Sequence, residues 1–167
     1  KDIEYLFKKM SLKTASYTFI RPMQIGVALG GGSDELFDFC EKWGQKMGLA
    51  FQIQDNLLDF TSDDTGKDDF SDIKEANVNI LTYFVRKNEP KKFEQILEPN
   101  LGSEDISSED KKDIKNLFQS SGAIEYCENQ VEDYLNQSKK MLQEYPLTTE
   151  ISTELNNLIN LLENRKK

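Results

Sequence analysis

The chain has 167 residues and a mass of 19.3 kDa, and its 37% hydrophobic and 31% charged residues fit one globular domain. Its formal net charge of -9 and the lack of a Lys/Arg-rich face argue against a nucleic acid as partner, because phosphate backbones require a clustered basic surface. The sequence has no histidine, which excludes His-based acid–base catalysis, and no apolar run approaches the roughly 20 residues of a transmembrane helix.

Helical periodicity dominates the chain from its N-terminus, and no convincing alternating strand pattern occurs. The first predicted helix begins near Ile3 and continues through Lys13 and Thr14. Pro22 is expected to kink this helix, because proline lacks the backbone N–H that helical hydrogen bonding uses. The glycines at 30–32 are expected to end it.

A long second helix is predicted after Ser33 and Asp34, which offer an N-cap, and it reaches beyond Leu58. Gly44 and Gly48 lie on one face of this helix, one turn apart. Each costs about 1 kcal/mol relative to alanine in an exposed helix interior. Their presence therefore predicts the close approach of a neighbouring helix.

The middle of the chain is predicted to contain shorter helices. A loop at 62–71 precedes a helix from about Asp72 to Asn88, and a short helix that follows ends at Pro99. The stretch 100–108 is polar and lacks a periodic pattern, so we expect a surface loop there.

The last third of the chain is again helical. Ser107 and Asp110 form a predicted capping box that starts one helix. Gly122 separates this helix from a longer one at 123–144, and Pro146 separates the latter from the last helix. Six or seven helices with short connections predict an all-α helical bundle, in which metal sites are built from inward-projecting side chains of facing helices.

The cysteines and the C-terminus have simple interpretations. Cys40 and Cys127 are far apart and lie within apolar helical patterns, which indicates buried small side chains rather than ligands or a disulfide. This use of cysteine fits a reducing, cytoplasmic setting. The basic end, Arg165, Lys166 and Lys167, is interpreted as a solvated terminus.

The segment 49–75 is the most informative about function, because an apolar helical pattern there leads into an acidic loop. Asp55 and Asp59 are four residues apart, so they lie one turn apart on one helix face, with Gln52 one turn before them. Two such carboxylates repel each other unless they face water or a cation lies between them. Oxygen ligands without nearby cysteine or histidine suit Mg²⁺, which completes its shell with water and substrate phosphates.

The helix pattern alone leaves another explanation open, since such carboxylates often form only the solvated face of an amphipathic helix. Phe51 and Gln52 before them, and Gly66 and Lys67 after them, favour the functional interpretation. The Gly-Lys pair does not belong to a P-loop, because the upstream glycine is lacking and no strand precedes it.

These motifs resemble those of a known family. Residues 51–59 read Phe-Gln-Ile-Gln-Asp-Asn-Leu-Leu-Asp and precede a Gly-Lys pair, which resembles the second aspartate-rich motif of the trans-isoprenyl diphosphate synthases, or polyprenyl synthetases. Lys13 and Thr14, followed by a small-residue run from Gly26, resemble that family's Lys-Thr motif. Residues 120–126 resemble the turn that starts its late helices.

The resemblance implies a helical bundle of the isoprenoid synthase type. Members of the family are longer and carry a first aspartate-rich motif upstream of the Lys-Thr motif. Residues 1–167 are therefore expected to form the C-terminal half of an isoprenoid synthase domain, incomplete at the N-terminal side. The implied partners are the missing N-terminal half and a second subunit, in a homo- or heterodimer.

The implied activity is that of a trans-prenyltransferase, which ionises an allylic prenyl diphosphate for condensation with isopentenyl diphosphate. Asp55 and Asp59 would hold Mg²⁺, and Lys13 and Lys67 would bind diphosphate oxygens. Residues with an implied catalytic role are Lys13, Thr14 and Gln52.

The chain departs from the family pattern at two positions. Asn56 stands where the family has its second aspartate, and Asn77 where the family usually has a lysine. Asparagine can ligate a cation through its carbonyl oxygen but brings no charge. These changes favour an alternative, a non-catalytic regulatory or structural subunit of a polyprenyl synthase, whereas the retained motif residues favour the prenyltransferase.

Overall fold

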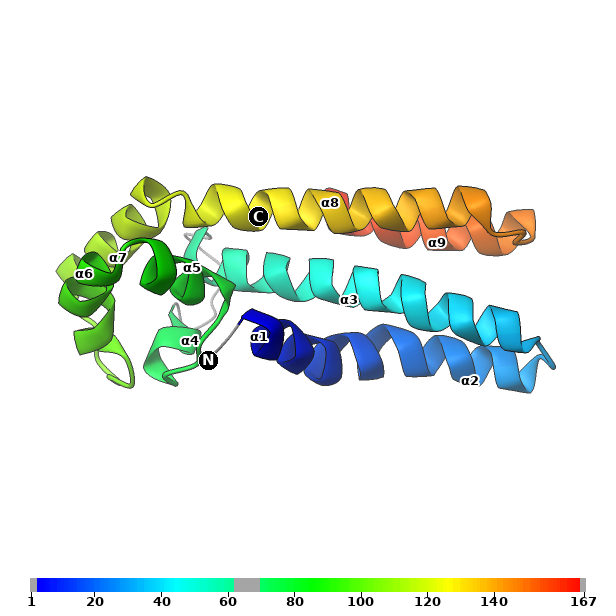
Figure 1. The fold of residues 1–167 in the computed structure, drawn as a ribbon, viewed down its shortest axis with the longest axis horizontal. Helices are drawn as coiled ribbons and strands as arrows, with labels where there is room; N and C mark the ends of the chain where they lie inside the picture. The colour runs from blue at the N-terminus through cyan, green and yellow to red at the C-terminus, as the bar shows by residue number, and fades with distance from the viewer. Residues whose placement is uncertain (1–2, 62–69, 166–167) are drawn as a thin grey trace. The chain divides into compact units, whose positions relative to one another are not determined.

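The computed structural model describes residues 3–61 and 70–165, and within them the chain forms helices and no strand (Figure 1). The prediction of an all-α chain is therefore confirmed. In the same part of the chain, no helix combines the length and apolar character that crossing a membrane requires.

The chain divides into two compact units. One consists of residues 3–52 and 130–165, and the other of residues 53–129. The long helices α3 (Asp34–Thr61) and α8 (Ala123–Glu144) contribute to both units.

The first unit begins with a continuous helical segment that leads to a turn, after which the chain returns as α3 (Figure 1). Its parts are α1 (Ile3–Met10), the π-helix η1 (Ser11–Ile20) and α2 (Arg21–Leu29). The backbone N–H of Arg21 donates to the carbonyl oxygen of Ser16, five residues earlier, as in a π-helix. The sequence predicts a kink at Pro22, and the structure places the change from π- to α-helix there.

Gly44 and Gly48 of α3 face η1, which confirms the close approach predicted from their spacing. A Cβ atom on Gly48 would lie 2.3 Å from the Cα and Cβ atoms of Ala15, and one on Gly44 would lie 2.8 Å from Cγ1 of Ile20. A larger side chain at Gly48 requires the backbone of η1 to shift, whereas one at Gly44 must first displace the side chain of Ile20. The two contacts run in opposite directions along the sequence, so η1 and α3 pack antiparallel.

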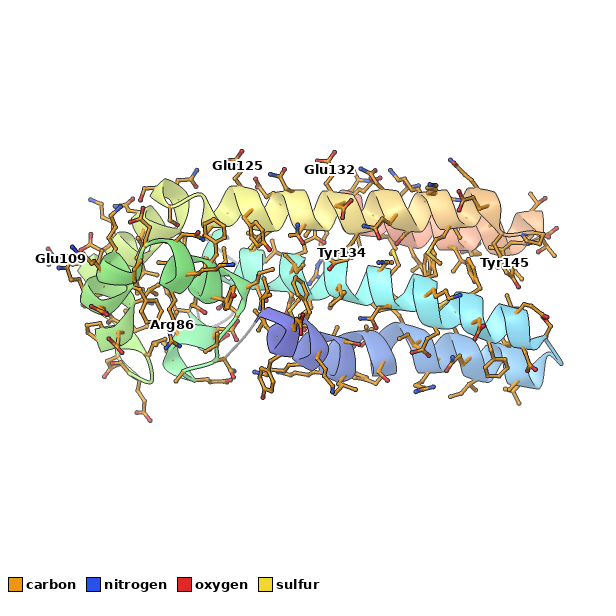
Figure 2. The ribbon with its side chains drawn as sticks, in the orientation of Figure 1. Arg86, Glu109, Glu125, Glu132, Tyr134 and Tyr145 are labelled. Atoms are coloured by element: carbon orange, nitrogen blue, oxygen red, sulfur yellow. The ribbon has the colours of Figure 1, made fainter. Side chains whose placement is uncertain are left out.

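Two half-buried tyrosines, one within α8 and one just after it, pack on other helices of this unit. Tyr134 points from α8 toward the helices opposite (Figure 2), and its ring centroid lies 6.4 Å from that of Phe7. Near the end of α8, the ring of Tyr145 lies 4.5 Å from that of Phe39. The last helix, α9 (Thr149–Glu163), follows after a short turn.

The second unit contains the end of α3, the start of α8 and the shorter helices between them. These are α4 (Ser71–Lys74), α5 (Ile80–Asn88), α6 (Pro90–Lys92), the π-helix η2 (Phe93–Leu97), the 3-10 helix η3 (Glu98–Asn100) and α7 (Ser108–Ser120).

The prediction of one helix from Asp72 to Asn88 is wrong, because the structure has two. Ala76 adopts a left-handed backbone conformation with φ of 51°, which ends the helical run. Asn79 is extended and caps α5: its side chain accepts a hydrogen bond from the backbone N–H of Thr82, whose hydroxyl accepts one from Asn79. This capping box starts a new helix.

Other local predictions are confirmed. The side chains of Cys40, Trp43 and Cys127 are at most 2% exposed, as expected for core residues. Burial raises the pKa of both cysteine thiols and thus favours their protonated form. At the start of α7, the predicted N-cap is present, since Oγ of Ser107 accepts a hydrogen bond from the backbone N–H of Asp110 at 3.1 Å. The carboxylate of Asp110 accepts from the hydroxyl of Ser107 rather than from its backbone N–H, so only the N-cap half of the predicted capping box is found.

Candidate metal and diphosphate site

In the first unit, η1 brings the Lys-Thr pair against α3. Thr14 is 5% exposed, and its hydroxyl donates a hydrogen bond to Oε1 of Gln52. This bond joins residues that are 38 positions apart in the sequence. The close helix packing at Gly48 permits it, since a larger residue there would push η1 away from α3. Two of the predicted catalytic residues are thereby in direct contact.

Lys13 is exposed beside Thr14 and lines a shallow surface hollow. The other residues around this hollow are Tyr5, Lys8, Lys9 and Leu12. Three of the five side chains are therefore lysines, in a chain whose net charge is -9. The hollow is a local region of positive charge and can attract an anion electrostatically.

Phe51, the first residue of the aspartate motif, packs between two side chains of the first unit. Its ring centroid lies 6.0 Å from that of Phe19 and 4.5 Å from the guanidinium carbon of Arg165. Arg165 is half-buried, so its interpretation as part of a solvated terminus is wrong: the cation–π contact holds it. Lys166 and Lys167 lie outside the described residues.

In the second unit, Asp55 and Asp59 lie one turn apart on α3, and both are half-buried. The carboxylate of Asp59 accepts hydrogen bonds from the hydroxyl of Ser71 at 3.2 Å and from the backbone N–H of Asp72 at 3.5 Å. Burial and then the negative charge of Asp72 raise the pKa of Asp59, although the hydrogen bonds from Asp72 and Ser71 oppose the rise. A cation beside Asp59 would favour its ionised form.

Asn56 has a different role from the one that the motif suggests. Its side chain is 8% exposed, and its Nδ2 donates to Oδ2 of Asp72 at 3.0 Å. The same oxygen accepts a second hydrogen bond, from Nδ2 of Asn79 at 2.9 Å. Two neutral amides thus bind one carboxylate. Sequence reasoning missed Asn79, although Asn79-x-x-Thr82 is a recognisable capping signal.

The structure says less about the other residues that the sequence singled out. Asn77, at the family's lysine position, donates to Oε2 of Glu75 at 2.8 Å and supplies no positive charge. Lys67 and the acidic loop around it lie outside the described residues.

The oxygen atoms of Asp55 and Asp59 are the candidate metal donors. Over residues 3–61 and 70–165, no group of three or more His, Cys, Asp or Glu side chains is arranged to hold a metal. Mg²⁺ is usually bound through one or two carboxylates, with water and substrate phosphates completing its shell. Two carboxylates therefore fit Mg²⁺ bound jointly with a diphosphate, rather than a metal held by protein alone.

Comparison with known proteins leads to the same family as the sequence motifs. The family model for polyprenyl synthetase matches residues 1–119. The geranylfarnesyl diphosphate synthase of Aeropyrum pernix is 27% identical over 139 residues, which are 81% of this chain and 42% of that protein. The geranylgeranyl diphosphate synthase of Sulfolobus acidocaldarius is 32% identical over 139 residues, with 80% of this chain and 40% of that protein covered.

A solved structure supports the assignment. The geranylgeranyl pyrophosphate synthase from Corynebacterium glutamicum, complexed with isoprenyl diphosphate and magnesium, matches with a TM-score of 0.88 and 27% identity, over 99% of this chain and 47% of that one. The chain belongs to the polyprenyl synthetase family and has its all-α isoprenoid synthase fold. It spans less than half the length of these relatives.

Proposed function

We propose that residues 1–167 provide the C-terminal half of a Mg²⁺-dependent trans-prenyltransferase, which binds an allylic prenyl diphosphate for condensation with isopentenyl diphosphate. The hydrogen bond between Thr14 and Gln52 carries this proposal, because it joins the Lys-Thr motif to the first turn of the aspartate motif. Membership of the polyprenyl synthetase family supports the reaction class. An N-terminal half and a second subunit complete the proposed enzyme.

In the proposed reaction, the bond between the allylic carbon and a diphosphate oxygen breaks, and the double bond of isopentenyl diphosphate attacks the resulting cation. The new cation formed by this attack then loses a proton to the released pyrophosphate, which leaves a double bond in the elongated product. Asp55 and Asp59 would hold Mg²⁺, which when bound neutralises negative charge on the diphosphate. Lys13 and Lys67 would contact diphosphate oxygens as fixed positive charges.

Thr14 and Gln52 would act at the allylic carbon rather than at the diphosphate. The Thr14 hydroxyl donates its hydrogen to Gln52, which fixes the direction of the hydroxyl oxygen. A hydroxyl that donates its hydrogen keeps its acceptor lone pairs. These lone pairs suit the positive charge that develops on the allylic carbon.

Titration calorimetry with inorganic pyrophosphate, with and without Mg²⁺, tests the proposed site. We expect tight binding only with Mg²⁺, because the two aspartates repel the bare anion and the surface lysines of the hollow attract it only weakly in salt. Asp55→Asn should remove most of this binding. Asp110→Asn at the start of α7 removes an equal charge and should leave binding unchanged. Equal affinity with and without Mg²⁺ would contradict the shared-metal site.

A second candidate function is a non-catalytic regulatory or structural subunit of a polyprenyl synthase. The amides of Asn56 and Asn77 favour it, because each donates to a carboxylate of the protein at a position where the family has a charged residue. Incorporation of isopentenyl diphosphate by the protein with its N-terminal half distinguishes the two functions. Pyrophosphate binding without incorporation would identify the subunit.

A further inference from the structure

The contact between α3 and the short helix α4 is built from polar side chains. Asn56 on α3 and Asn79 before α5 are both buried, with 8% and 4% exposure, and both amides donate to Oδ2 of Asp72. The backbone N–H of Asp72 in turn donates to the carboxylate of Asp59. Asp72 is thus bound from two sides, and its main chain contacts the candidate metal ligand.

The chemistry of this contact requires an N–H donor at position 56. An aspartate there would have the same shape, but its ionised carboxylate has no hydrogen to donate. It would lie about 3.0 Å from the oxygen of Asp72, the length of the present hydrogen bond, with Asp59 also nearby. Carboxylates so arranged require a cation between them or must take up protons. The amide of Asn56 avoids adding a third carboxylate beside Asp59 and Asp72.

Asn79 links the same carboxylate to a second element. Its Oδ1 accepts the backbone N–H of Thr82 at 3.0 Å and caps α5, while its Nδ2 donates to Asp72. The oxygen and the nitrogen of the Asn79 amide therefore both make hydrogen bonds. The same side chain fixes the start of α5 and the position of Asp72.

We propose that Asn56 and Asn79 are positioning residues that hold Asp72 against α3 through hydrogen bonds to its carboxylate, and that Asp72 thereby orients Asp59. In this chain Asn56 is a hydrogen-bond donor to the protein and not a weakened metal ligand. This role of Asn56 and Asn79 does not depend on prenyl transfer.

Thermal unfolding of the 167-residue chain at pH 7, followed by circular dichroism, tests this role. Asn56→Asp should lower Tm by about 4 to 8 °C, because it replaces a hydrogen bond by a contact between like charges. The reciprocal double variant Asn56→Asp with Asp72→Asn restores one donor and one acceptor between these two positions, although it gives up the hydrogen bond from Asn79 to the same oxygen. It should regain a measurable part of the lost Tm, a rescue that mere space-filling by Asn56 does not produce.

Asn116→Asp on α7 is the matched control, since Asn116 is exposed and undergoes the same chemical change in the same unit. Its Tm should stay within about 1 °C of the wild type. If Asn56→Asp does not fold, a folded double variant still supports the proposal. Wild-type stability of Asn56→Asp, or a double variant no more stable than the single one, would overturn it.

Discussion

At Asp59, burial and the negative charge of Asp72 act on one carboxylate in the same direction. Both raise its pKa in the folded chain above the ordinary value of 3.8, and hydrogen bonds from Asp72 and Ser71 only oppose this rise. The folded state therefore holds the proton more tightly than the unfolded state does. It follows that ionised Asp59 lowers the stability of the folded chain near neutral pH. This destabilisation disappears as the pH falls through the raised pKa toward 3.8, because the carboxyl group takes up a proton there.

Asp59→Asn should therefore raise the stability of the chain at pH 7, by about 2 °C in Tm. The amide oxygen can still accept from Ser71, whereas the charge beside Asp72 is lost. The gain should shrink as the pH falls through the raised pKa, because the wild-type carboxyl becomes neutral there. Thermal unfolding between pH 7 and pH 4 measures this trend.

Asp113→Asn is the control for Asp59, because Asp113 is an exposed aspartate of α7. We expect it to leave Tm unchanged at each pH. Together with loss of Mg²⁺-dependent pyrophosphate binding, a more stable Asp59→Asn would show that this position is selected for binding rather than stability. A variant less stable than the wild type at pH 7 would contradict the electrostatic argument.

At the scale of the helices, the packing of α3 on η1 depends on Gly48. Gly48→Ala should lower the free energy of unfolding by about 1 to 3 kcal/mol, because its Cβ atom would lie 2.3 Å from backbone and side-chain atoms of Ala15. The helices must separate to accommodate it, and the hydrogen bond between Thr14 and Gln52 should weaken. Urea unfolding measures the loss, and Mg²⁺-dependent pyrophosphate titration shows whether binding changes as well.

Gly26→Ala on α2 is the matched control, since a Cβ atom there meets nothing within 4 Å. In a helix interior this exchange should be neutral or stabilise by up to about 1 kcal/mol. Equal effects of the two substitutions would mean that helix propensity, and not close packing, determines the role of Gly48.

The helices whose ends have strong local signals could be predicted from the sequence. The helix at 123–144 has the predicted bounds, because Gly122, with φ of +79°, allows the turn that precedes it. The contact at Gly48 was also predictable, because glycine in a helix interior has a cost that close packing explains.

Other features could not be predicted because their causes are not periodic. The π-helix at 11–20 has the apolar pattern of an ordinary helix, and tight packing on α3 coincides with the altered geometry. The division at Ala76 depends on one left-handed residue that is neither glycine nor asparagine. In the candidate site, the pair Asp55 and Asp59 follows from helix spacing, whereas the donation of Asn56 to Asp72 depends on a tertiary contact.

At the scale of the whole chain, the first helical segment exposes large apolar side chains. On α1, η1 and α2 these are Tyr5, Leu12, Tyr17, Ile25 and Leu29, with exposures from 49% to 85%. Apolar groups in such numbers along one segment favour association. We expect the isolated chain to self-associate with increasing concentration, which sedimentation velocity measures.

Paired substitution Ile25→Ser and Leu29→Ser should shift this association toward the monomer. Leu161→Ser on α9 is the control, because Leu161 is 66% exposed but lies on another helix. A chain that stays monomeric at all concentrations, or an equal effect of the control, would show that the segment does not mediate association.

The isolated chain should bind pyrophosphate with Mg²⁺ but should not elongate prenyl diphosphates. It spans 42% of the Aeropyrum pernix synthase, and the proposed site uses only the motifs of the C-terminal half. Without the rest of the enzyme, the proposed Mg²⁺ site can still bind a diphosphate, but a second substrate is not oriented toward the allylic carbon. Incorporation of radiolabelled isopentenyl diphosphate, with farnesyl diphosphate as the allylic substrate, should stay at background for a monodisperse preparation. The same assay on the protein with its N-terminal half should show turnover that Asp55→Asn abolishes. Elongation by the isolated chain that is lost in Asp55→Asn would mean that these 167 residues form a complete site, and the proposal of a half-domain would then be wrong.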